Sequence, residues 1–81
     1  MDKQRALYGI ITDVWRLIKP YLAMVPLTQE AWAELVSRED DLQDTVMETY
    51  GADELAFATG MMRYANDYIA VVGGQKKEVD R

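Results

Sequence analysis

The amino-acid sequence predicts an all-α protein, a small three-helix bundle with kinked first and second helices. Apolar residues recur at helical spacing in three segments, turn-forming residues separate these segments, and no stretch shows the alternation of a strand. At 81 residues the chain suits one domain. We expect a single helical domain over residues 1–74 and a charged, flexible tail over residues 75–81.

The first helix is expected from Lys3 to Met24, with Asp2 as its N-cap. Pro20 lacks an amide donor and its ring clashes with the preceding turn, which predicts a kink or break near Lys19. The apolar stripe of this helix is wide. It consists of Leu7, Ile11, Val14, Ile18 and Leu22, broadened by Tyr8, Trp15, Leu17 and Tyr21.

The second helix is expected from Gln29 to Tyr50, after an N-cap at Thr28. Leu27 before the cap and Trp32 after it occupy the two positions of a hydrophobic staple. The remaining apolar positions of the segment are Leu35, Val36, Leu42, Val46 and Met47.

One charged residue disturbs the pattern of the second helix. In a continuous helix, Glu39 falls inside the apolar arc, where burial of a carboxylate costs free energy. Ser37 followed by Asp40 matches a capping box, and an interruption there would explain Glu39. The sequence therefore predicts a kinked or interrupted second helix.

The third helix is expected from Glu54 to Val72. Gly51 suits the left-handed position that closes the second helix, and Asp53 suits the N-cap of the third. Gly73 and its glycine neighbour end the helix. Within it, Gly60 is expected to allow close approach of another helix.

Acidic residues are concentrated in one part of the chain. Residues 30–54 hold nine of the fourteen acids and one base, Arg38, whereas the rest of the chain is net positive. Six of these acids fall within an arc of roughly 120°, opposite the apolar positions, and would form a stripe up to about 27 Å long. These six are Glu30, Glu34, Asp40, Asp41, Asp44 and Glu48.

This acidic stripe has two interpretations. It could bind a basic protein surface, because complementary charge speeds association and selects basic partners. It could also be an ordinary solvated helix face, the commoner role of a charge run. A stripe of this sign argues against direct binding of DNA or RNA, which requires Lys and Arg on phosphates.

The third helix carries more apolar surface than a surface helix needs. Beside a core stripe of Leu55, Ala58, Met62, Ala65, Ile69 and Val72, a second stripe broadens the apolar arc to about 200°. The second stripe is a candidate partner or homodimer interface, since Tyr and Met are enriched at interfaces. The alternative is that both stripes are core. The candidate interface residues are Phe57, Met61, Tyr64 and Tyr68, with Val71 beside them.

Catalysis and cofactor binding find little support. The sequence has no Cys and no His, which removes disulfides, thiolate metal sites and the commonest metal ligand and general base. No glycine-rich phosphate loop, HExxH motif or EF-hand spacing occurs. No signal peptide and no membrane span is expected, because charged residues such as Asp13 and Arg16 interrupt the apolar stretches. We expect no enzyme, no cofactor and no metal site.

The stretch Tyr8-Gly9-Ile10-Ile11-Thr12-Asp13-Val14-Trp15, followed by Lys19, Tyr21 and Trp32, resembles the opening of small phage and prophage proteins of Firmicutes-type bacteria. The resemblance covers about the first 35 residues and contains no catalytic motif. It implies a phage accessory protein in a bacterial cytoplasm. Small, acidic, cysteine-free proteins of that setting include inhibitors of host defence such as anti-CRISPR proteins, some of which occupy nucleic-acid grooves.

Two hypotheses follow. In the first, the protein is a non-enzymatic inhibitor or modulator whose acidic stripe meets a basic host protein that handles nucleic acid. In the second, it is a self-associating structural helical bundle whose acidic face is only solvated.

Overall fold

The structure, a computed structural model, describes residues 2–74 and confirms the all-α three-helix bundle. The helices are α1 (Lys3–Leu22), α2 (Gln29–Thr49) and α3 (Ala52–Val72), and no strand occurs among the described residues. Their bounds lie within two residues of those expected. The flexible tail predicted over residues 75–81 lies outside the described residues.

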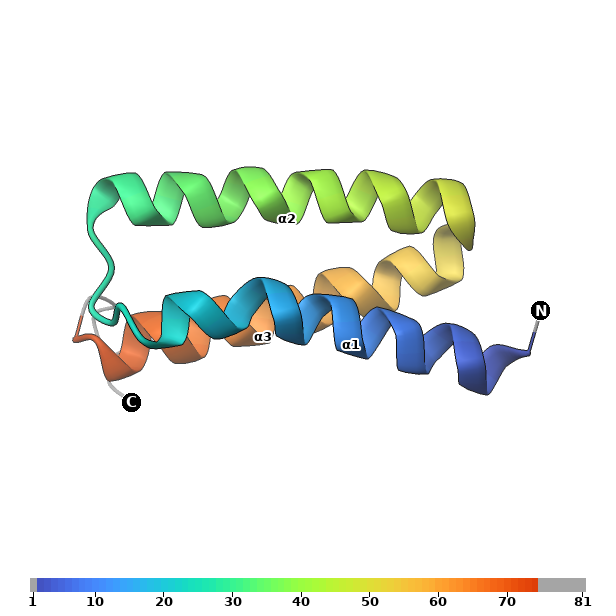
Figure 1. Cartoon of the computed structure of the whole chain (residues 1–81), viewed down its shortest axis with the longest axis horizontal. Helices are drawn as coiled ribbons and strands as arrows, with labels where there is room; N and C mark the ends of the chain where they lie inside the picture. The colour runs from blue at the N-terminus through green and yellow to red at the C-terminus, as the bar shows by residue number, and fades with distance from the viewer. Residues whose placement is uncertain (1, 75–81) are drawn as a thin grey trace.

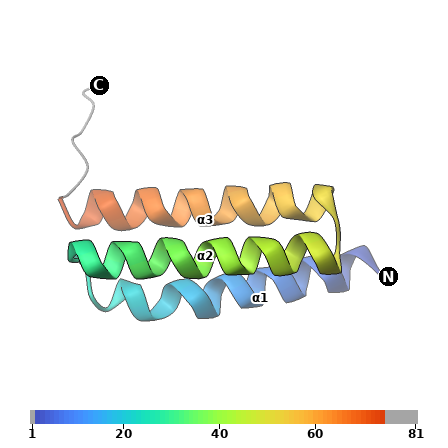
Figure 2. The ribbon, with the colours of Figure 1, turned by 90° about the horizontal axis from the view of Figure 1, so that it is seen from above.

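The helices run up, down and up, so that α1 and α3 are parallel and α2 is antiparallel to both (Figure 1). Seen from above, α2 lies between the other two and covers one side of the α1–α3 pair (Figure 2). Every pair of helices is in contact. The opposite side of the α1–α3 pair is not covered by any described helix.

The core lies along the line where the three helices meet, and each helix contributes to it. α1 supplies the longest buried stripe, while α2 supplies only two apolar residues that are fully buried. The largest completely buried side chains are Ile10, Tyr21, Leu35, Val46, Met62 and Ile69. Ile11, expected in the α1 core stripe, is instead 44% exposed, because the buried face of α1 is centred on Ile10, Val14 and Tyr21.

The ends of α2 and α3 follow local sequence signals. The Thr28 hydroxyl oxygen accepts a hydrogen bond from the Ala31 amide at 3.0 Å, which confirms Thr28 as N-cap. Gly51 has a positive φ of 118°, a conformation that glycine adopts readily. Because the chain reverses at this one residue, α3 begins at Ala52, and the prediction of Asp53 as N-cap is wrong.

Neither helix is broken at the predicted position. Pro20 lies inside α1, in its last turn, where its missing amide removes one hydrogen bond close to the helix end. α2 continues through Ser37 without a break, and the straight α2 ribbon in Figure 1 shows this directly. An interruption is not needed, because Glu39 finds a hydrogen-bond partner on α3.

The expected role of Gly60 is also wrong. A Cβ atom added at Gly60 would meet nothing within 4 Å, so no helix approaches closely there. At Gly9 of α1, an added Cβ would stand 3.4 Å from the Tyr50 hydroxyl oxygen, which is an ordinary contact with a side chain.

Candidate protein-binding surfaces

The first candidate surface is the outer side of α2. All six carboxylates of the predicted stripe are exposed, and the helix that carries them is continuous. They extend over about 27 Å at 1.5 Å per residue. We call this surface the acidic face; it consists of Glu30, Glu34, Asp40, Asp41, Asp44 and Glu48.

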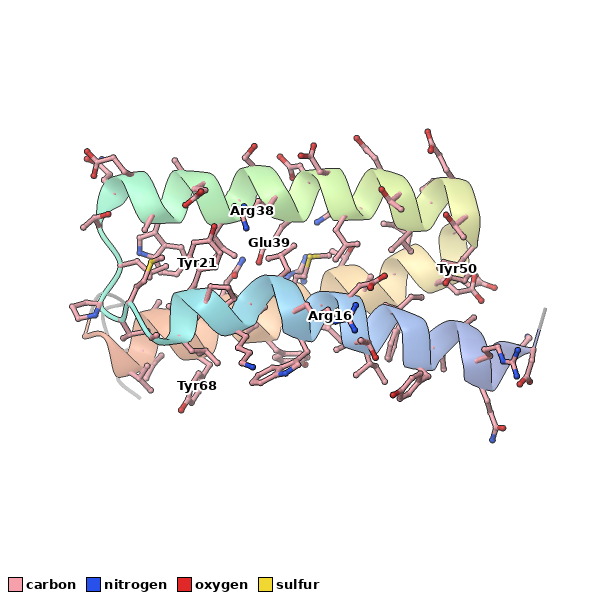
Figure 3. All side chains as sticks on the ribbon, in the orientation of Figure 1. Arg16, Tyr21, Arg38, Glu39, Tyr50 and Tyr68 are labelled. Carbon is pink, nitrogen blue, oxygen red and sulfur yellow. The ribbon has the colours of Figure 1, made fainter. Side chains whose placement is uncertain are left out.

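The acidic face is opposed by a single base. The Arg38 guanidinium lies 3.5 Å from a Glu34 carboxylate oxygen and 6.0 Å from the centre of the Tyr21 ring. In Figure 3, Arg38 reaches from α2 toward Tyr21 of α1, away from the outer side of the bundle. Within residues 2–74, the other five carboxylates of the acidic face have no ion pair. The negative field of this face is therefore largely uncompensated.

Tyr21 of α1 lies beside Glu34 and Arg38 on the inner side of α2. Its side chain is almost completely buried, and burial raises the pKa of its hydroxyl. A hydrogen bond to Glu34 raises that pKa further, while the Arg38 charge lowers it. Tyr21 therefore stays a neutral phenol at neutral pH and holds the Glu34–Arg38 pair against α1.

The second candidate surface lies on the opposite side of the bundle, between α1 and α3. A groove of about 570 Å³ runs between the two helices. Tyr64, Tyr68 and Trp15 on its edges are 78%, 60% and 51% exposed. Figure 3 shows Tyr68 pointing away from α2. We call this surface the α1/α3 face; its groove is lined by Ile11, Val14, Trp15, Ile18, Leu22, Met61, Tyr64, Ala65 and Tyr68.

The structure brings the predicted interface residues of α3 to this surface. Met61, Tyr64 and Tyr68 line the groove, and Phe57 lies one turn before Met61 and is 36% exposed. The alternative in which the second stripe is core is therefore wrong for Tyr64 and Tyr68. Met61 is partly buried and packs against the core from the groove side.

A third feature is a polar pair inside the bundle. The Asn66 side-chain amide donates a hydrogen bond to Oε1 of Glu39 at 2.9 Å, joining α3 to α2. Glu39 is only 5% exposed, and Figure 3 shows it directed from α2 toward the other two helices. Burial raises the pKa of its carboxyl, the nearby Asp40 charge raises it further, and the hydrogen bond from Asn66 lowers it.

This pair is incompletely satisfied. Oε2 of Glu39 and Oδ1 of Asn66 are buried without a hydrogen-bond partner among the described residues. A protonated Glu39 would convert Oε2 from an acceptor into a donor, which fits its raised pKa. Sequence reasoning found Glu39 as an anomaly but missed Asn66, whose signal was a polar residue beside the core stripe of α3.

Comparison with other proteins adds no assignment: no family model, no curated protein and no solved structure matches this chain. The described part of the chain has no group of three or more Asp and Glu residues placed to hold a metal ion. Across residues 2–74, no helix has the combination of length and apolar character required to traverse a bilayer. The two surfaces and the Glu39–Asn66 pair are the features on which a function can be argued.

Proposed function

We propose that this protein is a non-enzymatic protein-binding module whose acidic face binds a basic surface of another protein. The observation that carries this proposal is the row of six exposed carboxylates on one continuous helix, opposed by one base. Like charges four residues apart destabilise a helix by a few tenths of a kcal/mol per pair. A basic partner would turn this repulsion into attraction and would be attracted from a distance.

The spacing of the charges suggests the class of partner. Six carboxylates over about 27 Å place one negative charge roughly every 5 Å. A single DNA strand carries one phosphate charge per about 3.4 Å of helix axis, a density of the same order. A protein surface built from rows of Lys and Arg to hold phosphates would therefore also attract the acidic face. A host protein that handles nucleic acid is the partner that this charge pattern fits.

The resemblance of residues 8–15 to phage and prophage proteins supplies the biological setting of the proposal. In that setting the protein acts in the bacterial cytoplasm as an accessory protein. It inhibits or modulates a host defence protein in the manner of anti-CRISPR proteins, by occupying a groove that otherwise holds nucleic acid. No cofactor is required, since binding alone excludes the nucleic acid.

The test is a pair of charge-matched variants. Asp40→Lys/Asp44→Lys reverses two charges of the acidic face, whereas Asp2→Lys/Asp13→Lys reverses two exposed acids outside it. Asp2 makes no capping hydrogen bond through its side chain, so its replacement breaks no such bond and costs only the helix-dipole contribution of about 0.3–1 kcal/mol. Both variants change the net charge by the same amount.

The measurement is displacement of a fluorescent DNA duplex from purified CRISPR effector nucleases, followed by anisotropy. We expect the wild type and the Asp2/Asp13 variant to displace DNA, and the Asp40/Asp44 variant to fail. Added salt should weaken direct binding of the protein to the DNA-free nuclease, because it screens exposed charges. Equal loss in both variants would contradict a role of the acidic face itself. Absence of displacement by the wild type would reject this class of partner.

A further inference from the structure

The α1/α3 face is a large apolar surface that no described helix covers. Exposed aromatic side chains dominate it: Trp15, Tyr64 and Tyr68 line its groove, and Tyr8 stands about two helical turns before Trp15 on the same side of α1. These four residues are between 51% and 78% exposed. At roughly 200 Å² per aromatic side chain, they expose on the order of 500 Å² together. The largest apolar patch of an ordinary monomer measures about 300–600 Å² and is often functional. The aromatic residues alone reach this range.

The size of this face matches what a dimer needs. Two such faces packed together would bury on the order of 1,000 Å² from their aromatic residues, the area at which a biological interface begins. The aliphatic side chains of the groove add to this area. A layer of two parallel helices is also a shape that can pack on a second such layer, since the product is a four-helix arrangement with one shared apolar centre.

The two long edges of the face carry opposite charges. On the α1 edge, Lys19 follows Trp15 by four residues and so stands on the same side of the helix. On the α3 edge, Asp67 follows Tyr64 by three residues. Nearer the start of the two helices, α1 again carries a base, Arg5, and α3 again carries an acid, Asp53. All of these charged residues are exposed, so the face has a basic edge along α1 and an acidic edge along α3.

These charges lie at matching heights along the bundle. The groove-lining residues of α1 are centred on residue 16, and those of α3 between residues 64 and 65. Because the two helices are parallel, residues about 49 positions apart in the sequence lie at the same level. Lys19 is thus level with Asp67, and Arg5 is level with Asp53.

We infer that the α1/α3 face is the interface of a homodimer in which α1 of each copy lies over α3 of the other. The two-fold axis runs parallel to the helices. This arrangement places Lys19 opposite Asp67 of the second copy, and Arg5 opposite its Asp53. The reversed arrangement, α1 over α1, would set the basic edges against each other and the acidic edges against each other.

The dimer leaves α2 of each copy on the outside, so that two acidic faces point away from each other. The dimer interface rests on the α1/α3 face alone. Its consequence, that two basic partners or two sites of one partner bind at once, rests on the proposed function.

The first test is light scattering coupled to size-exclusion chromatography over a range of protein concentrations. We expect the wild type to have twice the 9.3 kDa mass of the chain. Tyr64→Ala/Tyr68→Ala should be a folded monomer, because both side chains are mostly exposed. Val36→Ala/Met47→Ala is the matched control, since it removes two exposed apolar side chains from α2, and it should remain a dimer.

A monomeric wild type at all concentrations would overturn the inference, and so would a Tyr64→Ala/Tyr68→Ala variant that stays dimeric. Neither variant alters the acidic face. A monomeric wild type that still displaces DNA from a nuclease would therefore reject the dimer and leave the proposed function standing. A dimer that displaces no DNA would support the dimer interface and reject the proposed function.

The second test addresses the direction of packing and uses the absence of Cys from the sequence. Ile11→Cys and Leu22→Cys place one thiol near each end of the groove. With the axis parallel to the helices, each variant should crosslink to itself through a short thiol reagent. If only a mixture of the two variants crosslinks, the copies are packed in the reversed direction, and the inferred arrangement is wrong.

The charged residues on the two edges test the direction of packing through the dimer dissociation constant. The two-fold axis repeats this ion pair, so Lys19→Glu removes two surface ion pairs per dimer and should raise the dimer dissociation constant about two- to thirtyfold. Adding Asp67→Lys should restore it, because the pair is then reversed. Failure of the double variant to recover would contradict the opposition of these residues.

Discussion

The outer side of α2 and the α1/α3 face are both exposed sides of amphipathic helices, yet the free energy of exposing them to water differs. The carboxylates of the acidic face are hydrated by water, so their exposure costs little free energy. The aromatic side chains on α1 and α3 order water around a large apolar area, and covering them is favourable. Exposed apolar surface is therefore the stronger indication of a contact, whereas exposed charge indicates what kind of partner would be attracted.

The difference also appears within single helices. α3 buries Met62 completely and exposes Tyr64 two residues later, so that one helix serves both the core and the face. On α2 the outer side carries the acidic face, and the inner side carries the core residues together with Glu39. The following predictions test this division, from the largest expected effect to the smallest.

The largest effect should separate the two sides of α3. Met62→Ala removes a fully buried side chain and should lower the free energy of unfolding by about 2–5 kcal/mol. Tyr64→Ala should change it by less than about 0.5 kcal/mol in the dissociated monomer. Urea unfolding of dilute protein measures both. Similar losses in the two variants would mean that Tyr64 belongs to the core.

Glu39→Gln tests the buried charge that interrupts the inner side of α2. The amide nitrogen of Gln can donate to Oδ1 of Asn66, while its oxygen still accepts from the Asn66 amide nitrogen. The two buried positions of the Glu39–Asn66 pair that lack a partner would then both be hydrogen-bonded. We expect a gain in the free energy of unfolding of about 1–3 kcal/mol at pH 7.

The pH dependence of this gain has a definite sign. Because the pKa of Glu39 is raised in the folded state, the folded protein holds this proton more tightly than the unfolded chain. The stabilisation from Glu39 is complete below the unfolded pKa and is lost as the pH rises through the folded pKa. The advantage of Gln should therefore shrink on acidification. Urea unfolding of the wild type and of Glu39→Gln over a series of pH values measures this trend, and a gain that does not change with pH would contradict it.

Gly60→Ala should stabilise the monomer by about 0.5–1 kcal/mol, because alanine loses less backbone entropy in a helix and the new methyl group meets nothing. Thermal unfolding of dilute protein would show the gain. A loss of stability would mean that the new methyl group clashes with a neighbouring residue.

The smallest effects concern the ends of the helices. The last turn of α2 has no basic residue, and Glu48→Lys should stabilise the protein by about 0.3–1 kcal/mol through the helix dipole. Asp53→Lys, in the first turn of α3, should have the opposite sign. Both effects should diminish with added salt in denaturant unfolding, as expected of exposed charges. Effects of equal sign would contradict the dipole explanation.

The sequence by itself determined the three helices, their ends to within two residues, the Thr28 cap and the exposure of the acidic face. These features depend on neighbours within one or two turns, or on the high cost of burying an unpaired carboxylate. The spacing of residues along the sequence was sufficient to predict these features. It failed at Ser37 and Asp53, where a plausible capping residue competed with a continuous helix and with the positive φ of Gly51.

Only the tertiary structure decided which apolar residues form the core. Periodicity gives the width of an apolar arc, but a helix in a three-helix bundle buries only the part that faces its two neighbours. That choice left Ile11, Trp15, Tyr64 and Tyr68 exposed and buried Ile10 in their place. It also brought Asn66 to Glu39, a pairing across 27 residues of chain that no local pattern contains. The rotation of each helix about its own axis is set by packing against the others, and that information is not local.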